Sequence, residues 1–415
     1  MSALRNYVLV TSAYWAFTLT DGALRMLVLL HFHELGYSPV ELAFLFLFYE
    51  FFGVVTNLLG GWLAARLGLK VTLFSGLALQ VVALAMLSFV APEWSKLVSV
   101  AYVMAAQALS GIAKDLTKMS SKSSIKVLVP ENATSSLFKW VAILTGSKNA
   151  LKGAGFFLGG LLLSMLGFRH SLWAMAGALV LVLVGCVLSL PADMGKAKSK
   201  AKFTTILSKT RAINVLSAAR FFLFGARDIW FVVGVPVFLS VQLGWGFTQV
   251  GAFLALWVVG YGAVQSSAPA IIRRWTKGEA PQGRAALVMA LLLAATSAAM
   301  AIGIVLGASP SVMLIAGLGV FGAVFALNSA VHSYLILAYS DGDKVAMNVG
   351  FYYMANAGGR LVGTLLSGAL YQLAGITGCL WGTVAFATVT AGISTLLPQG
   401  EATMLPAGVR VEAGD

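Results

Sequence analysis

The stretch FKWVAILTGSKNALKGAGFFLGGLLLSML, residues 138–166, is long and apolar enough to cross a lipid bilayer. It nevertheless carries Lys139, Lys148 and Lys152. On insertion scales, a charged residue at the centre of a membrane helix costs roughly 2.5 to 3.5 kcal/mol, so such residues face a wet cavity or a partner of opposite charge. The stretch therefore predicts a membrane-embedded fold with a charged interior.

The whole composition agrees with this stretch. Of 415 residues, 59% are hydrophobic and 10% are charged, whereas soluble chains average about 25% charged residues. Apolar runs that reach the length of a membrane helix cover residues 7–31, 39–64, 71–91, 97–119, 136–166, 169–190, 212–240, 247–272, 285–307, 311–339, 345–374 and 377–397. The first run is too long for a signal-peptide core and no A-x-A site follows it, so we expect it to be retained. The sequence predicts an all-α integral membrane protein with twelve transmembrane helices.

The basic residues between these runs indicate the orientation. With a cytoplasmic N-terminus, 18 Lys and Arg residues face the cytoplasm and only Lys96 and Arg169 face the other side. The positive-inside rule then places both termini in the cytoplasm. The net charge of +13 is thus explained by the membrane, and no nucleic-acid partner is predicted.

The chain divides into two similar parts. A Lys-rich segment, 191–211, separates an N-terminal six-helix half, 1–190, from a C-terminal half, 212–398, and a cytoplasmic tail, 399–415, follows. Four matches at an offset of 207 or 208 residues suggest duplication: Asp21 with Asp228, Leu35-Gly36-Tyr37 with Leu243-Gly244-Trp245, Arg66 with Arg274, and Asn149-Ala150 with Asn356-Ala357. Two parallel six-helix halves around a central cavity are the architecture of major facilitator transporters.

Several segments carry a family resemblance. GGWLAARLGLK, residues 60–70, resembles the facilitator loop signature through Gly61, Gly68 and Lys70, with Ala65 at the position that is usually acidic. YWAFTLTDGALRMLVLLHFHELGYSP, FLFYEFFGVVTNLLGGW, QALSGIAKDLTKMSSKSSIK and KWVAILTGSKNALKGAGFFLGG look like the ArsJ group of facilitator permeases. The resemblance implies export of an organic arsenate ester, 1-arseno-3-phosphoglycerate. It also implies a functional link to glyceraldehyde-3-phosphate dehydrogenase, which forms the ester when it accepts arsenate in place of phosphate.

Charges within the predicted spans favour an anionic cargo. Eight basic residues lie there, namely Arg25, Lys114, Lys139, Lys148, Lys152, Arg220, Arg227 and Arg360. Four carboxylates oppose them, namely Asp21, Glu50, Asp115 and Asp228. The excess of four positive charges favours a bound anion, while interhelical ion pairs remain the alternative.

The predicted binding residues come from both halves. Lys148 and Lys152 are four residues apart and share a helix face near the midplane, whereas Lys139 is close enough to the inner end to reach the cytoplasmic surface. The remaining candidates are Arg220, Arg227, Arg360, Asn149, Asn356 and Tyr352. Arg can bind a phosphate-like group with a planar fork and Lys supplies a mobile charge, which suits a cargo with two tetrahedral oxyanions.

Energy coupling has its own candidates. The chain has no P-loop, so proton coupling is the simplest hypothesis, with Asp21, Glu50, Asp115 and Asp228 as protonation sites. Glu50 is the first choice because its sequence neighbours supply no cation, and a satisfied buried carboxylate is the alternative. Asp21 and Arg25 have the spacing of an intrahelical ion pair, with a structural or gating role. Exchange of substrate anions is the alternative to proton coupling.

Other classes of function have less support. No Ser/His/Asp set and no metal-ligand spacing stands out, so we expect a transporter, not an enzyme, with no catalytic residues, cofactor or metal. Trivalent arsenic prefers thiolate ligands, but Cys186 and Cys379 lie in predicted spans six and twelve, which are peripheral in the facilitator fold. A pentavalent oxyanion therefore remains plausible as the cargo. We expect a monomer that carries a phosphorylated or arsenylated anion, with another organophosphate or organic anion as the alternative cargo.

Overall fold

The structure of the chain is a computed structural model that describes residues 2–67, 69–91, 93–128, 134–190, 210–276, 281–340 and 345–398. Within these ranges every regular element is a helix, so the all-α prediction is confirmed. Residues 191–209 of the predicted linker, Gly68 of the loop signature and the tail 399–415 lie outside the described residues. So do the side chains of Gly61, Ala65 and Lys139.

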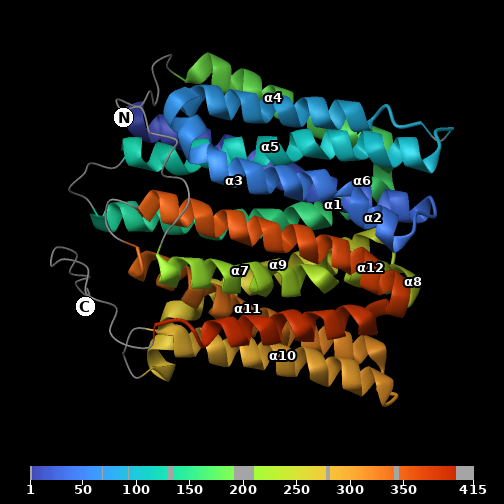
Figure 1. The fold of residues 1–415 in the computed structure, drawn as a ribbon. Coiled ribbons are helices and arrows are strands. Elements are labelled where there is room, and N and C mark those ends of the chain that lie inside the picture. Colours follow the sequence, from blue (N-terminus) through green and yellow to red (C-terminus); the bar gives the residue numbers. More distant parts are fainter. Residues whose placement is uncertain are drawn as a thin grey trace.

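Twelve helical elements run roughly parallel to one axis (Figure 1). They are α1 (Ser2–Glu34), α2 (Pro39–Leu45), α3 (Leu47–Leu67), α4 (Leu69–Leu87), α5 (Lys96–Leu128), α6 (Thr134–Ser189), α7 (Arg211–Phe231), α8 (Gly234–Val241), α9 (Phe247–Trp275), α10 (Gly283–Val305), α11 (Pro310–Ala338) and α12 (Val345–Ser394). By length and composition, nine stretches of the described residues are able to cross a membrane.

Two of the long helices are hairpins. In α6 the backbone turns at Gly167, where φ is 71°, and the Ser171 hydroxyl donates to the Leu162 carbonyl at 3.0 Å. In α12 it turns at Gly375, where φ is 59°, and the Cys379 thiol lies 3.6 Å from the Ser367 carbonyl. In a straight helix, residues 9 and 12 positions apart, as in these two contacts, would be separated by about 14 and 18 Å. Each hairpin therefore crosses twice, and both turns require φ values that favour glycine.

Two other spans are interrupted helices. A capping box at Ser38 starts α2, and the helix breaks at Phe46 before α3 continues the span. α7 and α8 break at Val232 and Val233, where the Ser367 hydroxyl accepts the backbone N–H groups of Val233 and Gly234 at 3.1 Å. Counting α1, the interrupted spans and the two hairpins, the described residues form the twelve predicted spans.

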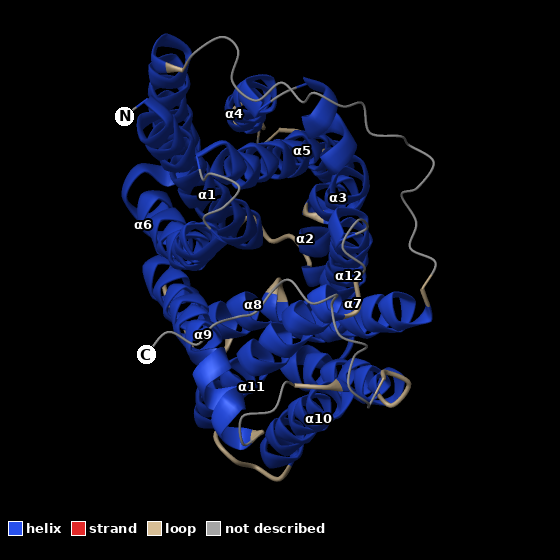
Figure 2. Ribbon diagram, turned by 90° about the vertical axis from the view of Figure 1, so that its left-hand side faces the viewer, coloured by secondary structure: helices blue, strands red, loops and turns tan. Residues whose placement is uncertain are grey.

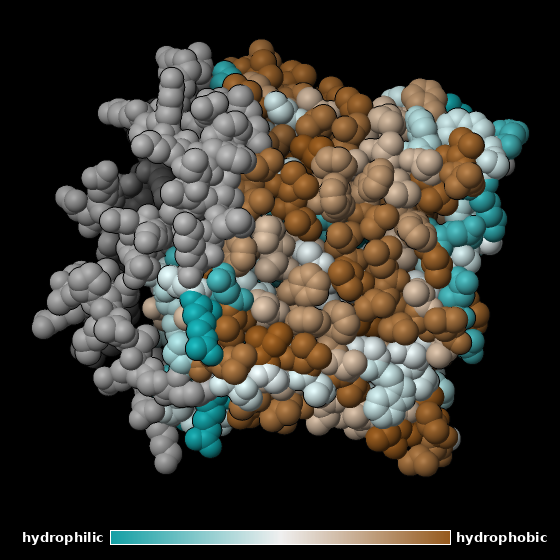
Figure 3. Space-filling view, viewed as in Figure 1, coloured by the Kyte–Doolittle hydropathy of each residue, from teal (hydrophilic) through white to brown (hydrophobic). Residues whose placement is uncertain are grey.

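The spans form two groups that are seen end-on in Figure 2, with α1 to α6 in the upper group and α7 to α12 in the lower. The groups pack against each other through α6 with α9 and through α12 with α2 and α3. Large apolar side chains such as Leu181, Leu188 and Leu256 are exposed on the outside. Figure 3 shows the resulting hydrophobic band, which suits contact with lipid tails.

Two glycines hold the groups together at the end where the turns 35–38 and 242–246 lie. A Cβ on Gly160 would strike the carbonyl oxygen of Phe247, and a Cβ on Gly368 would strike that of Pro39. The shift from 160 to 368 and the shift from 39 to 247 are both 208 residues, so the internal repeat also relates these contacts in space. Backbone therefore packs directly on backbone at this end.

We expect Gly160→Val and Gly368→Val to force the two groups apart at this end, because the added side chain has no space. Overpacking of this kind costs about 1 to 3 kcal/mol. Spin labels at Leu35 and Gln242 should move apart in double electron–electron resonance measurements. The matched control is Gly177→Val, because a Cβ there meets nothing within 4 Å. An unchanged label distance in both variants would contradict the assignment.

Candidate functional site

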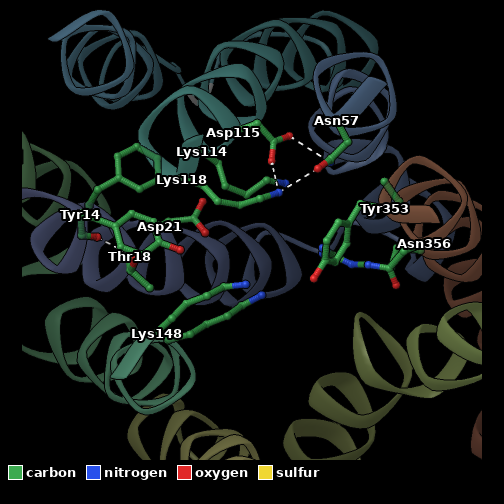
Figure 4. Close-up of a pocket in the computed structure, with 14 residues that line it drawn as sticks. Tyr14, Thr18, Asp21, Asn57, Lys114, Asp115, Lys118, Lys148, Tyr353 and Asn356 are labelled. Carbon is green, nitrogen blue, oxygen red and sulfur yellow. Dashed lines mark hydrogen bonds and ion pairs between the residues drawn. The ribbon is translucent and has the colours of Figure 1, made fainter. Parts of the chain in front are cut away.

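Two adjoining cavities lie between the groups, with volumes of about 180 and 220 Å³. Five residues line both of them: Lys148, Lys152, Tyr353, Asn356 and Arg360. Figure 4 shows the first cavity, in which Lys148 of α6 faces Lys118 of α5 and Asn356 of α12 across a shared space. The two cavities thus form one continuous region with walls from both halves.

This region is strongly basic. Eight basic side chains line the two cavities: Arg25, Lys114, Lys118, Lys148, Lys152, Arg220, Arg227 and Arg360. Three carboxylates line them: Asp21, Asp115 and Asp228. Even with Glu50, which is buried beside the cavities, the described lining keeps an excess of four positive charges.

The structure brings most of the predicted binding residues together. Seven of the eight line at least one cavity: Lys148, Lys152, Arg220, Arg227, Arg360, Asn149 and Asn356. The eighth, Tyr352, is fully buried and lines neither cavity, because its side chain packs under the guanidinium of Arg220 at 4.9 Å. Its neighbour Tyr353 lines both cavities instead.

Glu50 ties the two halves together. Its Oε1 accepts from Arg25 of α1 at 2.9 Å and from Arg360 of α12 at 2.5 Å, and the carboxylate is fully buried. The sequence neighbours of Glu50 supply no cation, but helices distant in sequence supply two. The bond to Arg360 crosses between the N-terminal and C-terminal groups.

The chain of charges continues in the C-terminal half. Arg360 Nε also donates to Asp228 Oδ2 at 3.2 Å, and Asp228 Oδ1 accepts from Arg227 Nε at 2.6 Å. Five alternating charges thus run from Arg25 through Glu50, Arg360 and Asp228 to Arg227. Three guanidiniums share two carboxylates, so the chain as a whole carries one net positive charge.

The expected ion pair between Asp21 and Arg25 is not formed. Arg25 turns to Glu50, while both oxygens of Asp21 accept from the hydroxyl of Tyr49, at 2.7 and 3.0 Å. Arg25 lies closer to the Glu50 carboxylate on α3 than to the Asp21 carboxylate on its own helix. Of the four predicted coupling carboxylates, Asp21 is the one with no Lys or Arg within 4.0 Å among the described residues.

Asp115 belongs to a separate cluster on the N-terminal side. It pairs with Lys118 at 2.9 Å and accepts from the Thr56 hydroxyl at 2.5 Å and from Asn57 at 3.3 Å. Lys114 lies over the ring of Tyr49 at 4.0 Å. This cluster borders the first cavity, so Asp115 is placed beside the candidate site but is already paired there.

Sequence reasoning missed part of the lining. Tyr261 and Gln265 of α9 and Ser329 of α11 line the second cavity, and Gln265 accepts from Asn149 at 3.2 Å. A signal was available, because Gln265 follows Asn57 by 208 residues and both are polar residues in apolar spans. Cys186 and Cys379 are buried and line neither cavity.

Comparisons with known proteins agree with this architecture. Residues 10–299 match the family model described as Major Facilitator Superfamily. A crystal structure of a POT family transporter in complex with a thioalcohol-conjugated peptide is similar, with a TM-score of 0.70, 17% identity and 94% of each chain covered. A crystal structure of a POT family transporter in complex with 5-aminolevulinic acid has a TM-score of 0.71, 16% identity and the same coverage. No curated protein matches the chain. With twelve spans in the described residues and a family model that matches more than half of its length, the chain belongs to the Major Facilitator Superfamily of transporters.

Proposed function

We propose that this transporter exports an organic anion with two tetrahedral oxyanion groups, and that its cargo is the arsenate ester 1-arseno-3-phosphoglycerate. The observation that carries the proposal is the excess of basic over acidic side chains in the region between the halves. Charges held at membrane depth need partners, and an anionic cargo supplies those that the protein lacks. The resemblance of the sequence to ArsJ permeases supports the particular ester.

The residues proposed to bind the cargo differ in whether a carboxylate of the protein already pairs with them. Arg227 contacts Asp228, and Arg360 contacts both Asp228 and Glu50, so a bound oxyanion has to compete with these carboxylates for the two arginines. Lys152 has no carboxylate within 4.0 Å among the described residues and lies 5.7 Å from the ring of Phe156. The Lys152 amine is therefore better placed to receive one oxyanion of the cargo than either of these arginines.

The ionic chain supports alternating access in this proposal. The contact between Glu50 and Arg360 joins the two halves, so a cargo that draws Arg360 away from Glu50 also loosens the interface. Binding energy of the anion would thereby favour the change of state. The transporter is proposed to act as a monomer in the inner membrane of a bacterium, with both termini in the cytoplasm and glyceraldehyde-3-phosphate dehydrogenase supplying the ester.

A second cargo class is another organophosphate or organic anion, moved by exchange. It draws on the same basic lining, and the pairing of Glu50, Asp115 and Asp228 with cations favours exchange over proton uptake at these three sites. A cationic cargo is disfavoured, because the lining would repel it.

Everted membrane vesicles test the cargo. With glyceraldehyde 3-phosphate, NAD⁺, radioactive arsenate and the dehydrogenase outside, wild-type vesicles should accumulate arsenic, and omission of the dehydrogenase should prevent this. Lys152→Gln should reduce the initial rate by about 10-fold or more, since it removes a charged contact. Lys96→Gln serves as the matched control, because Lys96 is exposed and distant from the cavities. Equal accumulation in vesicles without the transporter would refute the proposed cargo.

Asp21 is the carboxylate on which proton coupling can be tested. Its described hydrogen-bond partner is the Tyr49 hydroxyl, and no Lys or Arg of the described residues lies within 4.0 Å of the carboxylate. We expect Asp21→Asn to abolish accumulation driven by a pH gradient and to retain exchange of labelled for unlabelled substrate. Asp115→Asn, in which the lost carboxylate is paired with Lys118, is the comparison. If collapse of the pH gradient leaves wild-type accumulation unchanged, anion exchange replaces proton coupling.

A further inference from the structure

Arg220 differs from the three other arginines that line the cavities. Arg25 and Arg360 contact Glu50, and Arg227 contacts Asp228. Arg220 has no carboxylate within 4.0 Å among the described residues, although it is only 4% exposed. A buried guanidinium is always charged, so it needs hydrogen-bond acceptors and a counterion.

The Arg220 guanidinium is held firmly in place. Its plane lies over the ring of Phe224 at 3.9 Å and that of Tyr352 at 4.9 Å. Its Nη1 donates to the carbonyl of Ser329 at 3.3 Å and to the Ser329 hydroxyl at 3.2 Å, while its buried Nε has no hydrogen-bond partner. The fork is therefore fixed by its surroundings and still has donor capacity to offer.

Several donors compete for the Ser329 hydroxyl beside Arg220. Three donors converge on Ser329 Oγ: Arg220 Nη1, the Gln265 amide at 3.4 Å and the Tyr261 hydroxyl at 3.5 Å. A serine hydroxyl has two acceptor lone pairs and a proton of its own to donate. The cluster of Arg220, Tyr261, Gln265 and Ser329 thus directs three donors at one hydroxyl, and the buried Nε of Arg220 has no acceptor within hydrogen-bond distance among the described residues. All four line the second cavity, whose volume is about 220 Å³.

We propose that this cluster is a subsite for the tetrahedral end group of the cargo, a phosphate or arsenate monoester. Such a group presents several terminal oxygens, so it can accept from the guanidinium fork and from the hydroxyl and amide donors together. A carboxylate offers only two oxygens. This inference rests on the proposed function and refines it: the Arg220 cluster takes one oxyanion and the Lys148 and Lys152 side of the same cavity takes the other.

The subsite also assigns different roles to the predicted arginines. Arg227 and Arg360 belong to the chain of charges that joins the halves. Arg220 is not part of that chain and binds one tetrahedral end group of the cargo. Phosphate and arsenate have the same tetrahedral oxygens, so the subsite accepts both. Selection of the arsenate ester over other phosphate esters then depends on the second oxyanion.

Binding of inorganic phosphate to the purified full-length protein in lipid nanodiscs tests the subsite. Equilibrium dialysis with radioactive phosphate should show saturable binding by the wild type, displaced by arsenate. Arg220→Gln should weaken binding by about 10-fold or more, and Arg220→Lys, which keeps the charge without the fork, should bind with intermediate affinity. Lys96→Gln, far from the cavity, should bind like the wild type.

A thermal melt checks that each variant is folded. If Arg220→Gln fails to fold, Gln265→Leu carries the test, since it removes one donor at similar volume and should also weaken phosphate binding. No phosphate binding by the wild type, or equal binding by folded Arg220→Gln, overturns the subsite. Arg220-dependent phosphate binding without arsenic accumulation in vesicles would leave the subsite standing and refute the proposed cargo. If the vesicles accumulate arsenic but Arg220→Gln binds phosphate as the wild type does, the proposed cargo stands and the subsite is refuted.

Discussion

The contact between Glu50 and Arg360 is the interaction on which the arrangement of the interior depends. Both groups are charged at membrane depth, where each alone would be costly, and their 2.5 Å contact joins helices from opposite halves. Around it, Arg25, Asp228 and Arg227 extend an alternating chain. The position of one helix group relative to the other is therefore linked to which anions the arginines contact.

The two helix groups are alike in how they pack on each other but differ in the charged residues that line the cavities. Gly160 and Gly368 make equivalent backbone contacts, and Lys152 and Arg360 are also 208 residues apart. Glu50, however, has Val258 at the position 208 residues later. The 208-residue repeat thus relates the packing contacts of the two helix groups, whereas the charged residues that line the cavities differ between them.

Three sets of polar side chains at the cavities have distinct surroundings. The chain from Arg25 to Arg227 is largely neutralised within itself. In the second set, in the N-terminal half, Asp115 pairs with Lys118. Arg220 and its neighbours have donors in excess. The three sets therefore differ in which charges are already satisfied within the protein.

Hydropathy alone determined the twelve spans, because a lipid-facing helix must be apolar over its whole length. The count of charges within those spans likewise indicated a basic interior, and seven of the eight predicted binding residues line the cavities. Partner choice was decided only by the tertiary structure. Arg25 pairs with Glu50 instead of Asp21, and Tyr353 faces the cavity instead of Tyr352. Spacing along one helix cannot show which side chain a distant helix presents at 3 Å, and that proximity decides which charges pair.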